Sequence, residues 1–112
     1  MTVLTVRHGQ AEALPELRAV LELACNKAQL LYHAETAWSS GAFSGARHTI
    51  QLCFTGIDAI AFAEAFIERL PYQEFALVGR CVMDAAIIAV ERTRGDDEPA
   101  TTITLQLLTL EN

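Results

Sequence analysis

Two stretches of the chain alternate between apolar and polar residues, and this alternation constrains the fold more than any other feature. The first is RHTIQLCFTG, residues 47–56, and the second is TTITLQLLTL, residues 101–110. Because successive side chains of a β-strand point to opposite faces, each stretch predicts a strand with one apolar face. The two apolar faces consist of Ile50, Leu52 and Phe54 in the first stretch and Ile103, Leu105 and Leu107 in the second. A sheet made of such strands has only one fully apolar face.

Two other stretches have helical spacing. Residues 12–35, EALPELRAVLELACNKAQLLYHAE, predict a first helix, with Pro15 where the first turn tolerates it. The apolar residues on one face of that helix are Leu17, Val20, Leu21, Ala24, Ala28 and Leu31. Residues 58–70 predict a second helix, because Asp58 suits its first turn and Pro71 stops it. The second helix has one broad apolar face, so we expect it to cover a sheet.

Leu23 and Leu30 lie seven residues apart on the predicted first helix, away from its main apolar face. A second apolar stripe on one helix implies a second partner surface. The chain is also 52% hydrophobic, which is high for a small domain and favours apolar surface buried between subunits. We therefore predict a homo-oligomer, most simply a homodimer, with Leu23 and Leu30 at its interface. The alternative is two isolated exposed leucines, which monomers tolerate.

Residues 36–45, TAWSSGAFSG, are rich in serine, glycine and alanine and predict the longest loop of the chain. This loop carries two aromatic residues, Trp38 and Phe43. We expect this loop to fold the two aromatic side chains over an apolar surface of a partner subunit or of a small ligand. The alternative is a plain surface connection whose two aromatic side chains lie in the core.

The remaining segments complete an α+β fold. Residues 2–7 predict a first strand. Residues 75–94 exceed an average strand, so we divide them near Met83 and Asp84, at a tight turn or at a bulge. The predicted order is β-α-β-α-β-β-β, which is related to ferredoxin-like folds by element order alone. We predict a single domain, residues 1–112, in which a mainly antiparallel sheet carries both helices on one face as a two-layer sandwich.

Charge and hydrophobicity exclude two classes of partner. Fourteen acidic and eight basic residues give a net charge of −6, which repels a nucleic-acid backbone. The most apolar segment, residues 75–90, is interrupted by Arg80 and Asp84 and is shorter than a membrane-spanning helix. The N-terminus also lacks the pattern of a signal peptide. We therefore expect an acidic cytoplasmic protein that binds neither nucleic acid nor a membrane.

Cysteine and histidine form no recognised metal-binding pattern along the chain. The three cysteines are Cys25, Cys53 and Cys81. They lie inside predicted helices or strands, which indicates reduced and buried thiols and not a disulfide framework. The histidines His8, His33 and His48 have no H-x-x-x-H spacing, so we predict no metal ion and no cofactor. His48 could still meet His8 if the first two predicted strands are neighbours, which would allow a metal or phosphate site.

The triplet Arg7-His8-Gly9 follows an apolar run and resembles the opening motif of the histidine phosphatase superfamily, whose histidine takes up a phosphoryl group. This resemblance implies a catalytic role for His8 with Arg7 beside it. That family surrounds the phosphoryl group with further positive groups, including a second histidine. Here residues 79–81, Gly-Arg-Cys, stand where the second histidine is expected. Without that partner, the triplet is also typical of a solvated strand end followed by a glycine turn.

Three classes of function remain. The first, which we favour, is a non-catalytic, homo-oligomeric module for protein interaction or small-ligand binding. The alternative is a small enzyme that acts on a phosphorylated or acidic small molecule in a cleft between Arg7, His8, His48 and the loop of Trp38. This enzyme requires His8 and His48 to converge. A subunit of a larger assembly differs from the first class in requiring a different partner protein.

Overall fold

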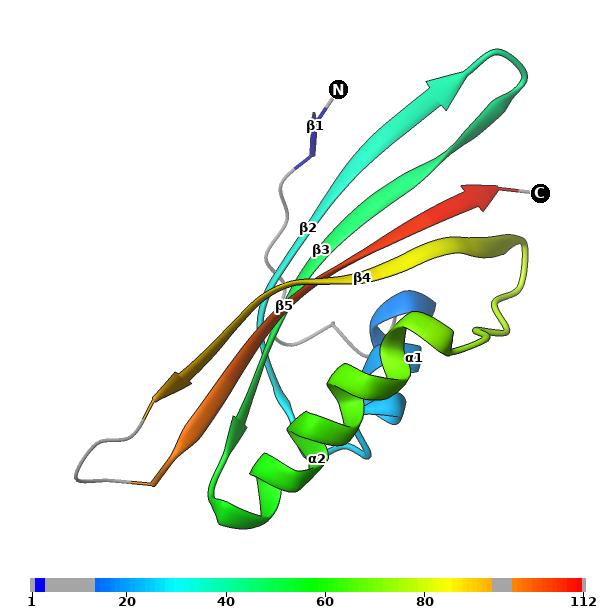
Figure 1. Ribbon diagram of the computed structural model, residues 1–112. Helices are drawn as coiled ribbons and strands as arrows, with labels where there is room; N and C mark the ends of the chain where they lie inside the picture. Colours follow the sequence, from blue (N-terminus) through cyan, green and yellow to red (C-terminus); the bar gives the residue numbers. More distant parts are fainter. Residues whose placement is uncertain (1, 4–13, 94–97, 112) are drawn as a thin grey trace.

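The computed structural model describes residues 2–3, 14–93 and 98–111 of the chain. It contains two α-helices, a short 3-10 helix and one five-stranded sheet (Figure 1). The elements in chain order are β1 (Thr2–Val3), α1 (Pro15–Leu23), β2 (Gln29–Ser40), β3 (Phe43–Thr55), α2 (Ile57–Arg69), η2 (Leu70–Tyr72), β4 (Arg80–Thr93) and β5 (Ala100–Glu111). The strands lie in the order β1-β2-β3-β5-β4, and every neighbouring pair is antiparallel. The predicted α+β fold class is confirmed.

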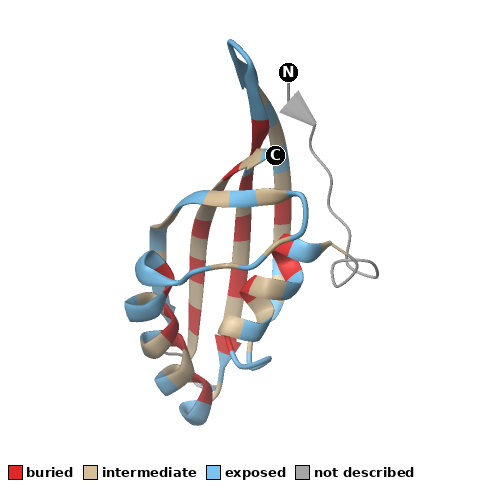
Figure 2. Ribbon diagram, turned by 90° about the vertical axis from the view of Figure 1, so that its right-hand side faces the viewer, coloured by how far each residue is buried: buried red, intermediate tan, exposed pale blue. Residues whose placement is uncertain are grey.

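Both helices pack against one face of the sheet, where the buried side chains of strands and helices meet (Figure 2). The core is formed on the strands by Ile50, Leu52, Phe54, Ile103, Leu105 and Leu107, and on the helices mainly by Leu17, Val20, Ala63, Phe66 and Leu70. The two alternating stretches therefore contribute the apolar faces that their sequences predict. No helix in the described part of the chain is long and apolar enough to cross a membrane.

The opposite face of the sheet carries hydrogen-bonded polar pairs. Gln51 pairs with Thr104 across β3 and β5, and its Nε2 donates to the threonine Oγ1 at 3.4 Å. Nε2 of Gln106 donates to Oγ1 of Thr49 at 3.3 Å in the same way. Cross-strand pairs of this kind stabilise a sheet face that no helix covers.

The first helix is much shorter than the prediction. It ends at Leu23, because Cys25 and Asn26 adopt left-handed backbone conformations with φ of 57° and 55°. The Asn26 amide donates to the Leu21 carbonyl and the Cys25 amide donates to the Glu22 carbonyl, each at 2.9 Å. This arrangement is a Schellman cap, and asparagine is one of the residues that tolerate such a conformation.

Residues 29–35 were expected to continue that helix and instead begin β2. Their backbone pairs with β3, with a bulge at Leu31 between Leu30 and Tyr32. The pairing partner lies more than ten residues away in sequence, so local helical periodicity could not reveal it. Tertiary pairing therefore overrides the helical pattern of this segment.

The loop predicted for residues 36–45 is also wrong. The segment is a β-hairpin in which Gly41 and Ala42 form the turn between β2 and β3. Gly41 has φ of 61°, which a glycine adopts at no steric cost, and two-residue turns favour glycine at this position. Trp38 and Phe43 therefore lie on strands and not on a loop.

Residues 80–93 form one continuous strand, so the division near Met83 and Asp84 is a bulge and not a turn. The register of β4 against β5 shifts twice, between Val82 and Asp84 and between Ile87 and Ala89.

The order of the elements is β-α-β-β-α-β-β, which corrects the predicted β-α-β-α-β-β-β. The ferredoxin-like relation stays a prediction. Of the predicted first strand, Thr2–Val3 is confirmed as β1, and residues 4–7 lie outside the described residues.

Candidate functional site

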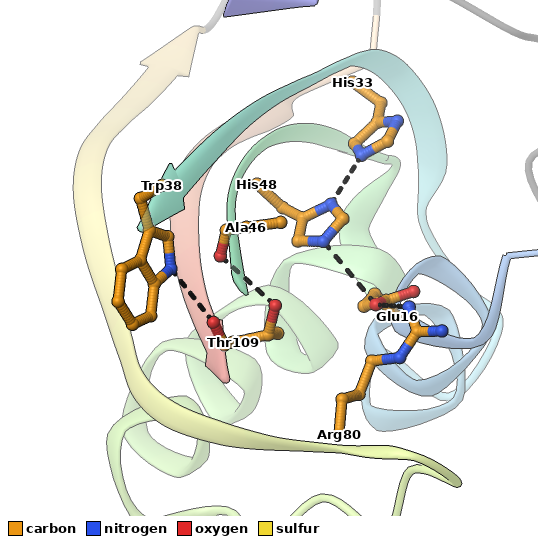
Figure 3. A network of polar contacts seen from close by, with 7 residues as sticks. All are labelled: Glu16, His33, Trp38, Ala46, His48, Arg80 and Thr109. Carbon is orange, nitrogen blue, oxygen red and sulfur yellow. Dashed lines mark hydrogen bonds and ion pairs between the residues drawn. The ribbon is translucent and has the colours of Figure 1, made fainter. Parts of the chain in front are cut away.

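A chain of polar side chains runs from α1 to the edge of the core, between β2, β3 and the start of β4 (Figure 3). Glu16 belongs to the first turn of α1, His33 to β2, His48 to β3, and Arg80 is the first residue of β4. His33 pairs with the core residue Ile50, so the strand alternation directs both histidines toward the helix-covered face. Glu16, His33 and His48 are 1%, 2% and 3% exposed.

The two histidines are joined directly. Nε2 of His33 lies 2.9 Å from Nδ1 of His48, a hydrogen-bond distance. The ring planes differ by 13° and the ring centres are 5.2 Å apart, which places the rings end to end in nearly one plane, not face to face. One ring must donate along this line and the other must accept, and an imidazole nitrogen accepts only when it carries no proton. At least one of the two histidines is therefore neutral.

Glu16 is a buried carboxylate that lies next to Arg80 and His48. Nη1 of Arg80 donates to its Oε2, and Nε2 of His48 lies 3.6 Å from the same oxygen. Burial alone raises the pKa of Glu16, but hydrogen bonding with His48, Arg80 and the backbone, together with the charge of His48, lowers it from 4.5 to about 2. Glu16 therefore carries a full negative charge at neutral pH.

His33, Glu35 and His48 form a group that could bind a metal ion. One ligand atom from each residue lies within 4.8 Å of the others. Glu35 follows His33 by two residues on β2 and pairs with His48 across the ladder, so all three belong to the same face of the sheet. Two imidazoles and one carboxylate are a donor set that zinc accepts. Glu35 is exposed, so the group reaches from the core to solvent.

The predicted catalytic residues are only partly described. Arg7 and His8 lie outside the described residues, so their convergence with His48 is not tested. The histidine that contacts His48 in the described part of the chain is His33, which faces it across β2 and β3. His48 is also 97% buried, with its side chain directed at His33 and Glu16, not at solvent.

Trp38 lies near the turn of the β2–β3 hairpin and connects β2 to β5. Its indole Nε1 donates to the carbonyl oxygen of Thr109 on β5 at 3.0 Å. The indole passes over Gly45, where a Cβ atom would lie 1.8 Å from the Thr109 oxygen and 2.9 Å from the indole nitrogen. Only glycine allows this close approach. Phe43 is 61% exposed near the hairpin tip, and a role of Trp38 or Phe43 in binding a ligand or partner stays a prediction.

Leu23 and Leu30 do not share a helix face. Leu23 is the last residue of α1 and Leu30 lies on β2, and both are partly buried against the core. The helical stripe that joined them is therefore wrong, and their interface role stays a prediction.

The three cysteines are free thiols. Their expected burial is wrong, because Cys25 lies in an exposed turn, Cys81 is exposed and Cys53 is half-buried.

Exposed apolar side chains gather along β4 and the segment before it. Among the strands that the structure describes, β4 lies at the edge of the sheet and has β5 as its one neighbour. Met83 and Ile88 are the residues at its two bulges and are 54% and 55% exposed. Val78 and Tyr72, in the preceding segment, are 94% and 87% exposed. An extra residue at a bulge has no partner in the ladder, which explains why these two β4 side chains are left outside the core.

Sequence reasoning missed Glu16, His33 and Arg80 as members of one network. The helix predicted over residues 12–35 placed His33 and Glu35 on different faces, whereas a strand places residues two apart on the same face. The pattern His-x-Glu at residues 33–35 was therefore the available signal, and it becomes visible only once this segment is known to be a strand.

A comparison with solved structures shows a chain of the same fold. That chain belongs to a structure described as "Virion of native gene transfer agent (GTA) particle", and the superposition has a TM-score of 0.60. The two sequences are 16% identical, and the match covers 90% of this chain and 94% of the other. The likeness shows a shared fold. No protein-family model and no curated protein sequence matches the chain.

Proposed function

We propose that this protein is a non-catalytic subunit of a multi-subunit protein particle, and that its copies associate through the β4 edge, defined as residues 72–90. The observation that carries this proposal is the apolar character of an exposed edge strand. Residues 81–90 contain a single charged residue, Asp84, and display Met83 and Ile88 at their bulges. Natural proteins avoid long apolar edge strands unless something covers them.

The two bulges favour association by side-chain packing over the addition of a strand. Each bulge interrupts the regular spacing of backbone groups along the β4 edge, which a second strand would need for a continuous ladder. Complete burial of a methionine or isoleucine side chain stabilises by about 1.5–3 kcal/mol. Met83 and Ile88 are half exposed, so their burial would contribute about 1 kcal/mol each per copy. Val78 and Tyr72 extend the same apolar surface.

The solved structure that shares this fold supports the proposed role as a particle subunit. The chain with the shared fold comes from a gene transfer agent virion, and the match covers almost the whole of both chains. A homodimer is the smallest assembly that the β4 edge would form, and a symmetric homodimer is the commonest arrangement among soluble oligomers. The free thiols of the three cysteines agree with assembly in a reducing compartment such as the cytoplasm.

The test is the oligomeric state of the full chain and of two matched variants, measured by sedimentation velocity and native mass spectrometry. The first variant carries Met83→Glu with Ile88→Glu in the β4 edge. The control carries Ile57→Glu, because Ile57 is 79% exposed in the first turn of α2, where an acidic residue suits the helix dipole. We expect the wild-type chain and the control to sediment as the same oligomer and the double variant as a folded monomer.

Two results would contradict the proposal. One is a wild-type chain that remains monomeric at concentrations near 100 μM, where even a weak interface of about 6 kcal/mol would be populated. The other is a double variant with an unchanged oligomer, which would move the interface elsewhere. Circular dichroism of each variant separates loss of assembly from loss of fold.

A further inference from the structure

We propose that the chain binds one divalent transition-metal ion of the zinc class between Nε2 of His33 and Nδ1 of His48, with the Glu35 carboxylate as the third protein ligand. The two ring nitrogens already face each other in the core, and the carboxylate belongs to the same sheet face. The site would be distinct from the β4 edge and does not depend on self-association.

The separation of the two nitrogens is close to what a metal ion requires. Zinc binds imidazole nitrogen at about 2.0–2.1 Å, so two nitrogens on one tetrahedral zinc ion lie about 3.3 Å apart. The observed distance is 2.9 Å. Because the two rings lie end to end, each ring must turn by about 35° before both nitrogens point at one tetrahedral ion, and this rotation converts the hydrogen-bonded pair into a pair of ligands. In that state each neutral ring keeps its single proton on the nitrogen that faces away from the metal.

The surroundings of His48 match those of a metal-binding histidine. Such a histidine usually directs its other ring nitrogen at a carboxylate, which fixes the orientation and the protonated nitrogen of the ring. Nε2 of His48 faces Oε2 of Glu16 at 3.6 Å, and Arg80 holds the same carboxylate oxygen. In this position the Glu16 carboxylate can accept a hydrogen bond from the Nε2–H group of His48 when Nδ1 coordinates the ion.

The charges also favour a cation. Glu16 and Glu35 contribute two negative charges and Arg80 contributes one positive charge, so the group is negative when the histidines are neutral. Buried imidazoles alone would leave a divalent ion poorly compensated. Glu35 is exposed, which gives an ion a route from solvent to His33 and His48.

The experiment measures Zn²⁺ binding to the full chain by isothermal titration after treatment with a chelator, and Co²⁺ binding by visible absorption. We expect one ion per chain, with ligand-field bands of nitrogen and oxygen ligands and no thiolate band. His48→Asn and His33→Asn should each weaken binding more than Glu16→Gln does. Loss of the carboxylate that faces Nε2 of His48 predicts a decrease of about 10–100-fold in zinc affinity. Glu35→Gln removes an exposed ligand and should weaken binding without affecting the fold.

Two control variants test whether the zinc ion binds at the proposed site. The combined variant Cys25→Ser, Cys53→Ser, Cys81→Ser should bind as the wild type does, because it removes the thiolates, which are strong zinc ligands outside the proposed site. Glu64→Gln, on the outer side of α2, should also bind normally. The proposal is overturned if no stoichiometric ion binds, if binding survives both Glu35→Gln and His48→Asn, or if the serine variant abolishes it. Each of these results leaves the oligomer test of the β4 edge unaffected.

Discussion

Replacing Glu16 by glutamine should remove a pH-dependent part of the stability of the fold. Glu16 is 1% exposed and its pKa is lowered from 4.5 to about 2, because favourable contacts with His48, Arg80 and the backbone outweigh the cost of burial. Each pKa unit corresponds to about 1.4 kcal/mol, so the ionised carboxylate contributes about 3 kcal/mol to the free energy of unfolding at neutral pH. Glutamine keeps the size of the side chain and removes its charge.

The direction of the pH dependence follows from which state binds more protons. Between about pH 2 and pH 4.5 the unfolded chain protonates Glu16 while the folded chain leaves it ionised, so stability rises with pH in this window. The contribution is complete above pH 4.5 and is lost as pH falls toward 2. A single carboxylate limits the slope to about 1.4 kcal/mol per pH unit.

The assay is urea unfolding of the wild type and of Glu16→Gln from pH 2.5 to pH 7, in buffer that contains a chelator. The difference between the two free energies should rise through the acidic window and reach a plateau of about 3 kcal/mol above pH 5. Glu64→Gln is the matched control, because Glu64 pairs with Arg92 on the surface and such pairs contribute at most about 1 kcal/mol. A difference for Glu16→Gln that stays constant with pH would refute the reasoning.

Two further predictions concern the sheet. Gly45→Ala places a Cβ atom 1.8 Å from the carbonyl oxygen of Thr109, so β3 and β5 must separate, and urea unfolding should show a loss of at least about 2 kcal/mol. Leu105→Ala opens a cavity at a fully buried position of β5, and the same measurement should show a loss of about 3 kcal/mol with an unchanged m-value.

The predictable part of the fold is the part whose pattern is local. Alternation at residues 47–56 and 101–110 identified two strands and their core faces, and residues 58–70 identified a helix within one residue of each end. In each case the spacing of the apolar residues indicates which face is buried against the rest of the molecule. The fold class follows from these elements, because one-faced strands and a one-faced helix require two layers.

The errors arose where long-range pairing decides the structure. Residues 29–35 have helical spacing but pair with β3, and Asn26 was the local sign that the helix ends. His33 and His48 are 15 residues apart and meet only because the hairpin turn at Gly41 sets the register of β2 against β3. Arg80 and Glu16 are 64 residues apart and meet through the packing of α1 against the sheet. No spacing rule along the chain detects such contacts.

The buried network and the β4 edge are joined by one residue. Arg80 is the first residue of β4, and its ion pair with Glu16 fixes the start of this strand to α1. Residues 73–79 before it have no helix or strand, so the position of the exposed Val78 depends on this anchor. Replacing Glu16 removes the charge that holds Arg80, and the apolar edge then begins from a less ordered segment. The polar network thus positions the strand that presents the apolar surface, and in the proposed assembly it would act through this strand, because its buried members lie outside that surface.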